Sequence, residues 1–591
     1  MDWIGLAPAD VFTLLAYFVG ITVLGLWISR TVRNTTDFFV GGRRFGRLFS
    51  TFLNFGAGTH SDQAVSLTAK VYTTGLSGIW YQWLYLFATP FYWLIYAMLR
   101  RCRAISSADY FEVRFGRSVA MLFVVIGMLN LMVTIGTMLK GSGALIHATT
   151  GGKLSEDLVI ALVTVVFVVY GMAGGLVAAV VTDFVQGMLT IVFSFLLLPF
   201  ALREVGGFAG LQAGVKRVFA EYGAPGVASA EAMWSIVAPA DSEITLFYVV
   251  VLTFNALVGV VGQPSGIPTS NASRTDRDAQ FGAVTGTIMK RICSISWCLL
   301  AMCAFVLFPG MTAREEIDRA FGMLAHRLLP QVAPGLIGVF TASLLASIMA
   351  ACDAFMISCS GLFTQNLYRP LTAGRKSERH YVNVGRAAAG VCVLGGVGFA
   401  YAFESVLHGL ELFWKISALM GIAFWAGLFW RRANAAGAWA GTLAAFAVLV
   451  ATSDVWLGDR LIWSFNARLA DRLPSFMLWR GNLALHWQML AYLAAGTTGV
   501  VIGSLLARRP DAARLDRFYG VLRTPVEPGE VITAPFTLPA GVVPPPSHKL
   551  IDHPDWEIQV PGRRSIIGFL LTLLSSVLLV GLLYALSRIG A

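Results

Sequence analysis

The sequence has few charged residues for its length. Of 591 residues, 44 are Lys or Arg and 33 are Asp or Glu, so charged residues make up 13% and hydrophobic residues 56%. The mean hydropathy is +0.69. A soluble chain of this size carries about 25% charged residues. The composition therefore excludes a soluble globular protein and favours one embedded in a lipid bilayer.

Cysteines and catalytic motifs are also scarce. Six of the seven cysteines fall in apolar segments and Cys102 falls in a basic loop, which excludes a disulfide framework. The sequence has no phosphate-binding glycine loop, no His/Cys spacing of a metal site and no nucleophile motif. We predict neither enzymatic activity nor a cofactor. The net charge of +11 arises in particular loops, so we expect no nucleic-acid partner, and nothing indicates an obligate protein partner.

What the chain does have is about fourteen mostly apolar runs of roughly 18 to 30 residues. A helix of about 20 such residues spans a bilayer core of about 30 Å, and a spanning segment must satisfy its backbone internally. We predict an all-α integral membrane protein with about 14 transmembrane helices. Their ranges are 10–29, 46–69, 74–99, 117–147, 156–173, 177–202, 244–267, 282–309, 333–367, 384–406, 409–430, 435–453, 487–507 and 564–587.

Basic residues are distributed unevenly among the loops. Loops rich in Arg and Lys stay on the cytoplasmic side of a membrane. All basic clusters fall on that side if the N-terminus is outside, and the C-terminus then also lies outside. The clusters are Arg30–Arg47, Arg100–Arg117, Arg274–Arg277, Arg369–Arg379, Arg431–Arg432, Arg508–Arg517 and Arg563–Arg564. We expect a multi-pass protein of a bacterial inner (plasma) membrane with both termini outside.

Two predicted helices contain stretches that interrupt a helix. Residues 54–63 combine Gly56 and Gly58 with a dense polar cluster, and residues 262–268 contain two glycines and two prolines. Irregular backbone at membrane depth survives only beside a cavity or inside protein. The stretches occupy corresponding places in two successive groups of five helices, which is typical of the binding site of an inverted-repeat transporter. The alternative is that both are ordinary loop ends with small residues.

Four spaced motifs resemble those of the sodium:solute symporter family, over roughly residues 8 to 450. They are DFFVGGR at Asp37–Arg43, GGLVAAVVTDFVQ at Gly174–Gln186, LFTQNLYR at Leu362–Arg369 and GLFWRRANAAG at Gly427–Gly437. Fourteen helices with both termini outside further resemble the sodium/glucose cotransporter branch. The resemblance implies a leucine-transporter-like core, a 5+5 inverted repeat that alternates access to a central site.

This resemblance divides the chain into seven segments. The two five-helix repeats, 46–202 and 244–430, would form the core around an extracellular loop at 203–243. The other segments are an N-terminal helix and cytoplasmic loop (1–45), two additional helices (431–507), a cytoplasmic linker (508–562) and a C-terminal helix (563–591).

The resemblance also implies solute contacts. The sugar-binding branch has a Gln late in its first broken helix, and Gln63 matches it. In the following helix the branch has Tyr-Glu-Trp, where this chain has Tyr81, Gln82 and Trp83. Amides both donate and accept hydrogen bonds, which suits neutral polar solutes, although they can also be helix-packing groups. In the second broken helix, Gln263-Pro264-Ser265 stands where the branch has Asn-Gln-Tyr, and Gln263 is the candidate solute contact there. His60 can titrate near neutral pH and support proton coupling. The alternative is that it only forms structural hydrogen bonds in the opened helix.

The sodium site implied by the resemblance is incomplete. In the family, backbone carbonyls of the first broken helix, here of Gly56 and Thr59, hold sodium together with two adjacent hydroxyl residues, since a hard cation prefers oxygen ligands. The aligned positions are Ala350 and Ala351. We therefore expect an atypical ion site.

Several charged or polar residues can compensate for the missing hydroxyls. Ser347 or Asp353 could supply oxygen, and Asp183 matches the family's acid on the cytoplasmic ion path. An intramembrane carboxylate is costly and is a functional candidate by default. Lys140 is a further candidate solute contact. Its ammonium group can pair with Asp62, Asp183 or Asp353, or occupy the space of the missing cation. Alternatively, its side chain extends to the membrane surface.

We predict a secondary active transporter, a solute:cation symporter that moves a small polar organic solute, such as a sugar, by alternating access. The resemblance implies Na+ as the coupling ion. The alternatives are a proton-coupled or uncoupled carrier, and a transporter-shaped solute sensor.

Overall fold

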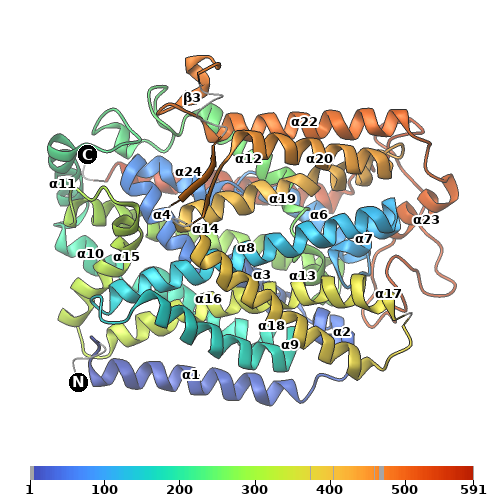
Figure 1. Cartoon of the computed structure of the whole chain (residues 1–591), viewed down its shortest axis with the longest axis horizontal. Coiled ribbons are helices and arrows are strands. Elements are labelled where there is room, and N and C mark those ends of the chain that lie inside the picture. Colours follow the sequence, from blue (N-terminus) through green and yellow to red (C-terminus); the bar gives the residue numbers. More distant parts are fainter. Residues whose placement is uncertain (1–4, 373, 404, 458–459, 465–470, 590–591) are drawn as a thin grey trace.

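The computed structural model of the protein describes residues 5–372, 374–403, 405–457, 460–464 and 471–589. Long helices run side by side through the molecule (Figure 1). Within these residues, ten helical stretches are long and apolar enough to cross a bilayer. They are α1 (Pro8–Ser29), α8 (Arg117–Thr149), Gly175–Glu204, α14 (Asp276–Leu307), Leu336–Leu371, α18 (Glu378–Ala402), α19 (Val406–Phe429), α20 (Ala435–Thr452), α22 (Leu485–Leu506) and α24 (Arg563–Ser587). The prediction of an all-α integral membrane protein is confirmed.

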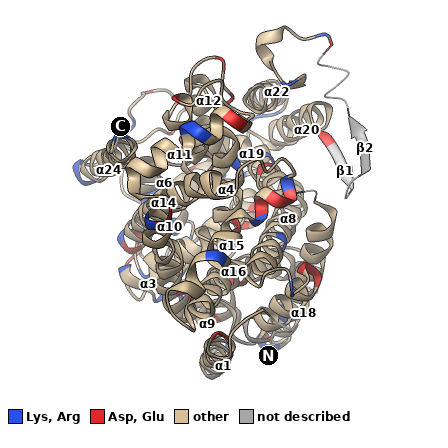
Figure 2. Ribbon diagram, turned by 90° about the vertical axis from the view of Figure 1, so that its left-hand side faces the viewer, with Lys and Arg blue, Asp and Glu red and all other residues tan. Residues whose placement is uncertain are grey.

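The two ends of the helix bundle differ in what they carry. Both termini lie at one end, near α10 (Leu198–Glu204) and α11 (Gly207–Tyr222), and α23 (Ala512–Arg523) lies at the other end (Figure 1). Viewed from the end with the termini, the helices carry few charged residues (Figure 2). This sparseness is expected of helices whose sides face lipid.

The first predicted break is present. The range 46–69 is divided into α3 (Arg47–Gly58) and α4 (Ser61–Thr74), and the backbone of Thr59 and His60 between them is extended. An extended pair ends the hydrogen-bond ladder of the helix, so backbone groups of this segment become available to a ligand.

The second predicted break is present as well. The range 244–267 is divided into α12 (Leu246–Val260) and α13 (Gly266–Ala272). Pro264 lies between them and has no N–H to donate to a helical ladder. The chain resumes as a short helix that extends five residues beyond the predicted end.

The prediction of one continuous helix over 74–99 was wrong. The structure has η2 (Gly75–Ile79), α5 (Trp80–Trp83) and α6 (Thr89–Arg101), separated by turns between Leu84 and Ala88. Arg291 donates to the carbonyl of Gln82, which a continuous helix would pair with the N–H of Leu86. That N–H donates instead to the carbonyl of Trp83, at 2.8 Å. A distant side chain therefore interrupts this span.

The predicted helices 156–173 and 177–202 are joined as α9 (Glu156–Leu196), followed by α10. Within α9, Gly175 has φ of 55° and ψ of −157°, which separates two helical halves. A Cβ at this position would lie 2.5 Å from the ring of Phe38. Positive φ and close packing both require glycine there.

The centre of the bundle is α16 (Leu336–Gly361), which continues through η5 (Leu362–Tyr368) and α17 (Arg369–Leu371). Almost all of α16 is buried, whereas α1 exposes large apolar residues such as Phe12 and Trp27 on the outside. Such apolar exposure is expected of a lipid-facing helix.

Shorter elements lie mainly in the connections. The loops 203–243 and 311–332 contain the helices α11 and α15 (Arg314–Leu328). Strand β1 (Asp454–Leu457) pairs antiparallel with β2 (Arg460–Ser464), and β3 (Leu478–Trp479) with β4 (Asn482–Leu483). The remaining elements are α2 (Thr35–Val40), η1 (Gly41–Arg43), α7 (Ser107–Phe115), η3 (Ala232–Trp234), η4 (Leu329–Gln331) and η6 (Ser475–Met477).

The segment predicted as a cytoplasmic linker, 508–562, is attached to the bundle. It contains α23, and its Glu530 forms an ion pair with the buried Arg103. The N–H of Phe536 donates to the carbonyl of Cys102 at 2.9 Å. Glu557 pairs in the same way with Arg431, two residues after the end of α19. These contacts fix the segment along the end of the bundle opposite the termini.

Candidate functional site

A cavity of about 120 Å³ lies in the interior of the bundle. Both breaks line it, with Thr59 and His60 from the first and Gln263 and Ser265 from the second. Further lining residues come from α5, α6, α8, α14, α16 and α19. The two interrupted spans therefore meet at one chamber, as the sequence predicts.

Three side chains of the first break form a hydrogen-bonded chain. His60 Nδ1 contacts Asp62 Oδ1 closely, and His60 Nε2 lies 2.9 Å from Gln63 Nε2. With the Nδ1 proton directed at the carboxylate, Nε2 accepts from the Gln63 amide. The Gln63 Oε1 atom is buried and has no hydrogen-bond partner among the described residues. It remains an available acceptor in the cavity wall.

Gln82 is held by its neighbours. Its Nε2 donates to the carbonyl of Gln63 at 3.4 Å, and its own carbonyl accepts from Arg291 Nη1. Both Gln63 and Gln82 line the cavity, so the predicted amide pair is brought together.

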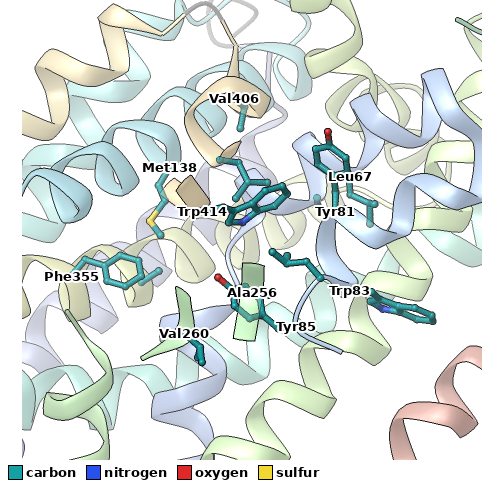
Figure 3. Close-up of a cluster of buried hydrophobic side chains, with 14 of the residues drawn as sticks. Leu67, Tyr81, Trp83, Tyr85, Met138, Ala256, Val260, Phe355, Val406 and Trp414 are labelled. Atoms are coloured by element: carbon teal, nitrogen blue, oxygen red, sulfur yellow. The ribbon is translucent and has the colours of Figure 1, made fainter. Parts of the chain in front are cut away.

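Aromatic side chains form much of the remaining wall. Gln263 of the second break donates to the hydroxyl of Tyr85 at 3.0 Å. Trp414 lies beside Tyr81, with ring centroids 5.2 Å apart, and Phe355 lines the same cavity from α16 (Figure 3). Rings of this kind give a polar solute flat apolar surfaces to stack on while hydroxyls supply hydrogen bonds.

Two cationic residues of α14, Lys290 and Arg291, also line the cavity. Sequence reasoning missed both. Arg291 is 2% exposed, and its Nε has no hydrogen-bond partner among the residues that the structure describes. The available signal was a pair of adjacent basic residues that begins at the ninth position of the apolar run 282–309, at a depth where charge is expensive.

Two predicted solute contacts lie outside this lining. The fully buried Trp83 points away from Trp414 and Phe355 (Figure 3), and its Nε1 donates to Ser294 Oγ at 2.8 Å. Lys140 is near Asp318 of α15. Burial raises the pKa of Asp318 to about 7, against the opposing effects of the Val406 N–H and of Lys140.

Three of the predicted ion residues, Gly56, Asp183 and Ala350, lie together at α3, whereas Thr59 lines the cavity. A Cβ at Gly56 would lie 3.4 Å from the carboxyl carbon of Asp183 and 3.5 Å from the Cβ of Ala350. Asp183 is fully buried, and neither of its carboxylate oxygens has a hydrogen-bond partner in the described part of the chain. A buried carboxylate with free lone pairs needs a cation or a proton.

Asp353, on α16, is within electrostatic range of Asp183 and is also fully buried. Ser347 donates to the carbonyl of its own helix at Leu344, at 2.7 Å. The Thr59 hydroxyl is buried and has no partner in the described residues. The carboxylates therefore form the main anionic groups of this region, and Ala350 and Ala351 contribute no side-chain oxygen.

A second polar network lies between the cavity and the loop that contains Glu243. Tyr81 donates to Glu411 Oε1 at 2.9 Å and accepts from the hydroxyl of Tyr248 at 3.1 Å. Lys70 pairs with Glu243 and lies 4.6 Å above the Tyr81 ring. Side chains from α4, α5, α12 and α19 thus close one side of the chamber.

The family model described as "Sodium:solute symporter family" matches residues 38–445. That range is more than half of the chain and contains both breaks. The chain belongs to the sodium:solute symporter family.

Two characterised relatives align with most of this chain. It is 24% identical over 487 residues to a sodium/glucose cotransporter from Vibrio parahaemolyticus, covering 74% of this chain and 84% of the relative. It is 25% identical over 533 residues to a sodium/proline symporter from Escherichia coli strain K12, covering 86% of this chain and 95% of the relative.

A solved structure shares the symporter fold. A Na+-coupled sialic acid symporter, in a substrate-bound outward-open state, aligns with a TM-score of 0.66 at 17% identity, covering 85% of this chain and 99% of that chain. Family and fold agree with the leucine-transporter-like core predicted from the sequence. The protein is a secondary active solute:cation symporter, and its family and fold are those of transporters rather than of enzymes.

Proposed function

We propose that this symporter moves a small polar organic solute across a bacterial inner membrane together with Na+, with both termini outside. The observation that carries the proposal is the meeting of two broken spans at one polar cavity, beside a fully buried carboxylate. Sodium/glucose and sodium/proline relatives support the ion and the small solute.

In this proposal the solute binds to the amides of the two breaks. Gln63 offers a buried acceptor oxygen. The Gln263 amide nitrogen donates to the hydroxyl of Tyr85, and a hydroxyl of the solute can form hydrogen bonds with the same two groups. The chain from Asp62 through His60 fixes the orientation of the Gln63 amide. A fixed amide loses little conformational freedom when the solute binds, which favours affinity.

We place the coupling cation next to Asp183. Sodium prefers oxygen ligands, and the Asp183 carboxylate has two oxygens without a hydrogen-bond partner among the described residues. It supplies the side-chain oxygens that Ala350 and Ala351 lack, and it adds a negative charge. Gly56 contributes room: its missing Cβ allows the carboxyl group to approach α3. Binding of the cation beside Asp183 would hold the first break in one conformation. Because the same break lines the solute cavity, cation binding would then affect solute binding.

A proton is the second candidate for the coupling ion. Two neighbouring buried carboxylates cannot both be ionised at low cost, and Asp183 lies within electrostatic range of Asp353. The two alanines on α16 supply no side-chain oxygen to a metal ion, which needs several oxygen ligands, whereas a proton needs one acceptor.

Uptake into proteoliposomes tests both candidates. The full-length protein is reconstituted, and labelled glucose, proline and lactate are offered under an inward Na+ gradient, an inward proton gradient or neither. We expect at least one solute to accumulate under the Na+ gradient, and a Na+ ionophore to abolish the accumulation. Accumulation driven by the proton gradient alone would favour the second candidate, and equal uptake under all conditions would contradict coupling.

A further inference from the structure

Two adjacent cationic side chains face the central cavity. Lys290 and Arg291 both belong to α14, and both line the chamber. Adjacent helical residues point about 100° apart, so the cavity must wrap around this part of α14. A ligand in the chamber can therefore meet both side chains at once.

The charges of the lining do not balance. Its acidic side chain is Asp62, which is already in contact with His60. Glu411 is hydrogen-bonded to Tyr81, and Glu243 is paired with Lys70. Asp62 can balance one cation, and the described lining then keeps one excess positive charge. An unbalanced charge at membrane depth is costly unless a ligand pairs with it.

The Arg291 guanidinium is held in place by one hydrogen bond, but not all of its N–H groups have a partner among the described residues. Its Nη1 donates to the carbonyl of Gln82, and its backbone carbonyl accepts from Ser294 Oγ at 2.8 Å. Its Nε is buried and lacks a partner among the described residues. Tyr85 and Tyr92 lie within electrostatic range of the guanidinium. A planar guanidinium held in this way can offer a free N–H to a carboxylate.

We infer that the transported solute carries a carboxylate, bound by Arg291 and Lys290, while the amides of Gln63 and Gln263 bind its neutral polar part. This inference rests on the proposed solute site. It refines the expectation of a neutral sugar to a small organic anion with further hydrogen-bonding groups.

A single negative charge fits better than a doubly charged group such as a phosphate. Asp62 offsets one of the two cations, so one positive charge remains for the ligand. A dianion would add a second charge close to Asp62 and would be repelled by it. The charge of the cavity lining therefore favours monocarboxylates over phosphorylated compounds.

Matched pairs of compounds test the charge of the ligand. Thermal stabilisation of the purified full-length protein is measured with glucuronate and glucose, and with lactate and lactamide. We expect one carboxylate to stabilise the protein, and its neutral counterpart to need at least about tenfold higher concentration for the same shift. A neutral compound that binds more tightly than its carboxylate partner would overturn the inference and leave the proposed function standing. No stabilisation by any compound would count against the proposed solute site itself.

Charge-removing and charge-keeping variants then assign the residues. Lys290→Gln and Arg291→Gln should lower affinity for the best carboxylate by about 10- to 100-fold and affinity for its neutral counterpart by less than about threefold. Lys290→Arg and Arg291→Lys keep the charge and should retain the preference. Equal losses for both compounds in the glutamine variants would mean a structural role and would contradict the inference. If Arg291→Gln does not fold, the Lys290 pair decides.

Discussion

The central cavity and the ion region carry charges of opposite sign, and α3 contacts both. The cavity lining contains Lys290 and Arg291, whereas the region behind Gly56 contains the buried carboxylates of Asp183 and Asp353. Unlike charges in adjacent compartments favour simultaneous loading with an anion and a cation. The difference suggests that each compartment depends on the other through the short extended segment that joins α3 to α4.

The largest expected effect comes from removing the charge of the ion region. Asp183→Asn keeps the size of the side chain but removes the anion that we propose to bind the cation. We expect gradient-driven uptake to fall by about 100-fold. Binding of the solute without a gradient, measured by thermal stabilisation, should fall much less. An unchanged accumulation ratio would show that Asp183 takes no part in coupling.

A matched control for this variant is Asp318→Asn. Asp318 is also a buried carboxylate, 4% exposed, but it belongs to α15 and accepts from the backbone N–H of Val406. We expect coupling to be retained when its charge is removed. A loss equal to that of Asp183→Asn would mean that any buried acid has this effect, and the comparison between compartments would fail.

A smaller effect is expected on the cavity side of α3. His60→Ala removes the group that connects Asp62 to the amide of Gln63. A free amide loses its fixed orientation, and a freed Asp62 can draw Lys290 away from the ligand. We expect solute affinity to fall by about tenfold, consistent with one or two lost hydrogen bonds.

His60→Gln is the informative partner of that variant, because glutamine can replace one of the two hydrogen bonds. We expect it to recover part of the affinity at every pH. If affinity in the wild type follows the titration of an imidazole and the glutamine variant abolishes this dependence, His60 acts through its charge rather than as an orienting group.

Much of the fold could be predicted from the sequence, because bilayer thickness and hydropathy constrain spanning helices strongly. The breaks at Thr59–His60 and at Val261–Ser265 could be predicted from glycine, proline and local polar residues. The interruption after α5 could not. It depends on Arg291, which is more than two hundred residues away, taking the carbonyl of Gln82.

The candidate site was predictable only where a motif marked it. Gln63, Gln82, Gln263 and His60 line the cavity, as the breaks and the resemblance suggest. Lys290 was missed because a lysine inside an apolar helix can equally face the interior or extend to a surface. Which of these holds depends on how the helix is rotated, and rotation is set by packing between distant segments rather than by local sequence.

The buried carboxylate of α15 provides a pH test outside the membrane-spanning helices. Burial raises the pKa of Asp318 from 3.8 to about 7, so the folded protein binds this proton more tightly than the unfolded chain. The contribution to stability is therefore full below about pH 4 and is lost as pH rises towards about 7. At neutral pH the loss is on the order of a few kcal/mol at most.

Asp318→Asn should remove this dependence. We expect the melting temperatures of variant and wild type to be similar near pH 4, and the variant to become the more stable of the two as pH approaches 7.5. The measurement is the difference between the two proteins at each pH, because other groups titrate equally in both. A difference that does not vary with pH would contradict the raised pKa.

The smallest expected effect on transport is at Trp83, which the sequence predicts as a solute contact but which is hydrogen-bonded to Ser294. Ser294 donates to the carbonyl of Arg291, so the Trp83 side chain is connected to the cavity wall indirectly. We expect Trp83→Phe to lower stability by about 1 kcal/mol and solute affinity by less than about threefold. Trp414→Phe, which changes a ring that lines the cavity beside Tyr81, should lower affinity more. The reverse order would place Trp83 in direct contact with the solute and would mean that the chamber extends further towards α14 than the structure indicates.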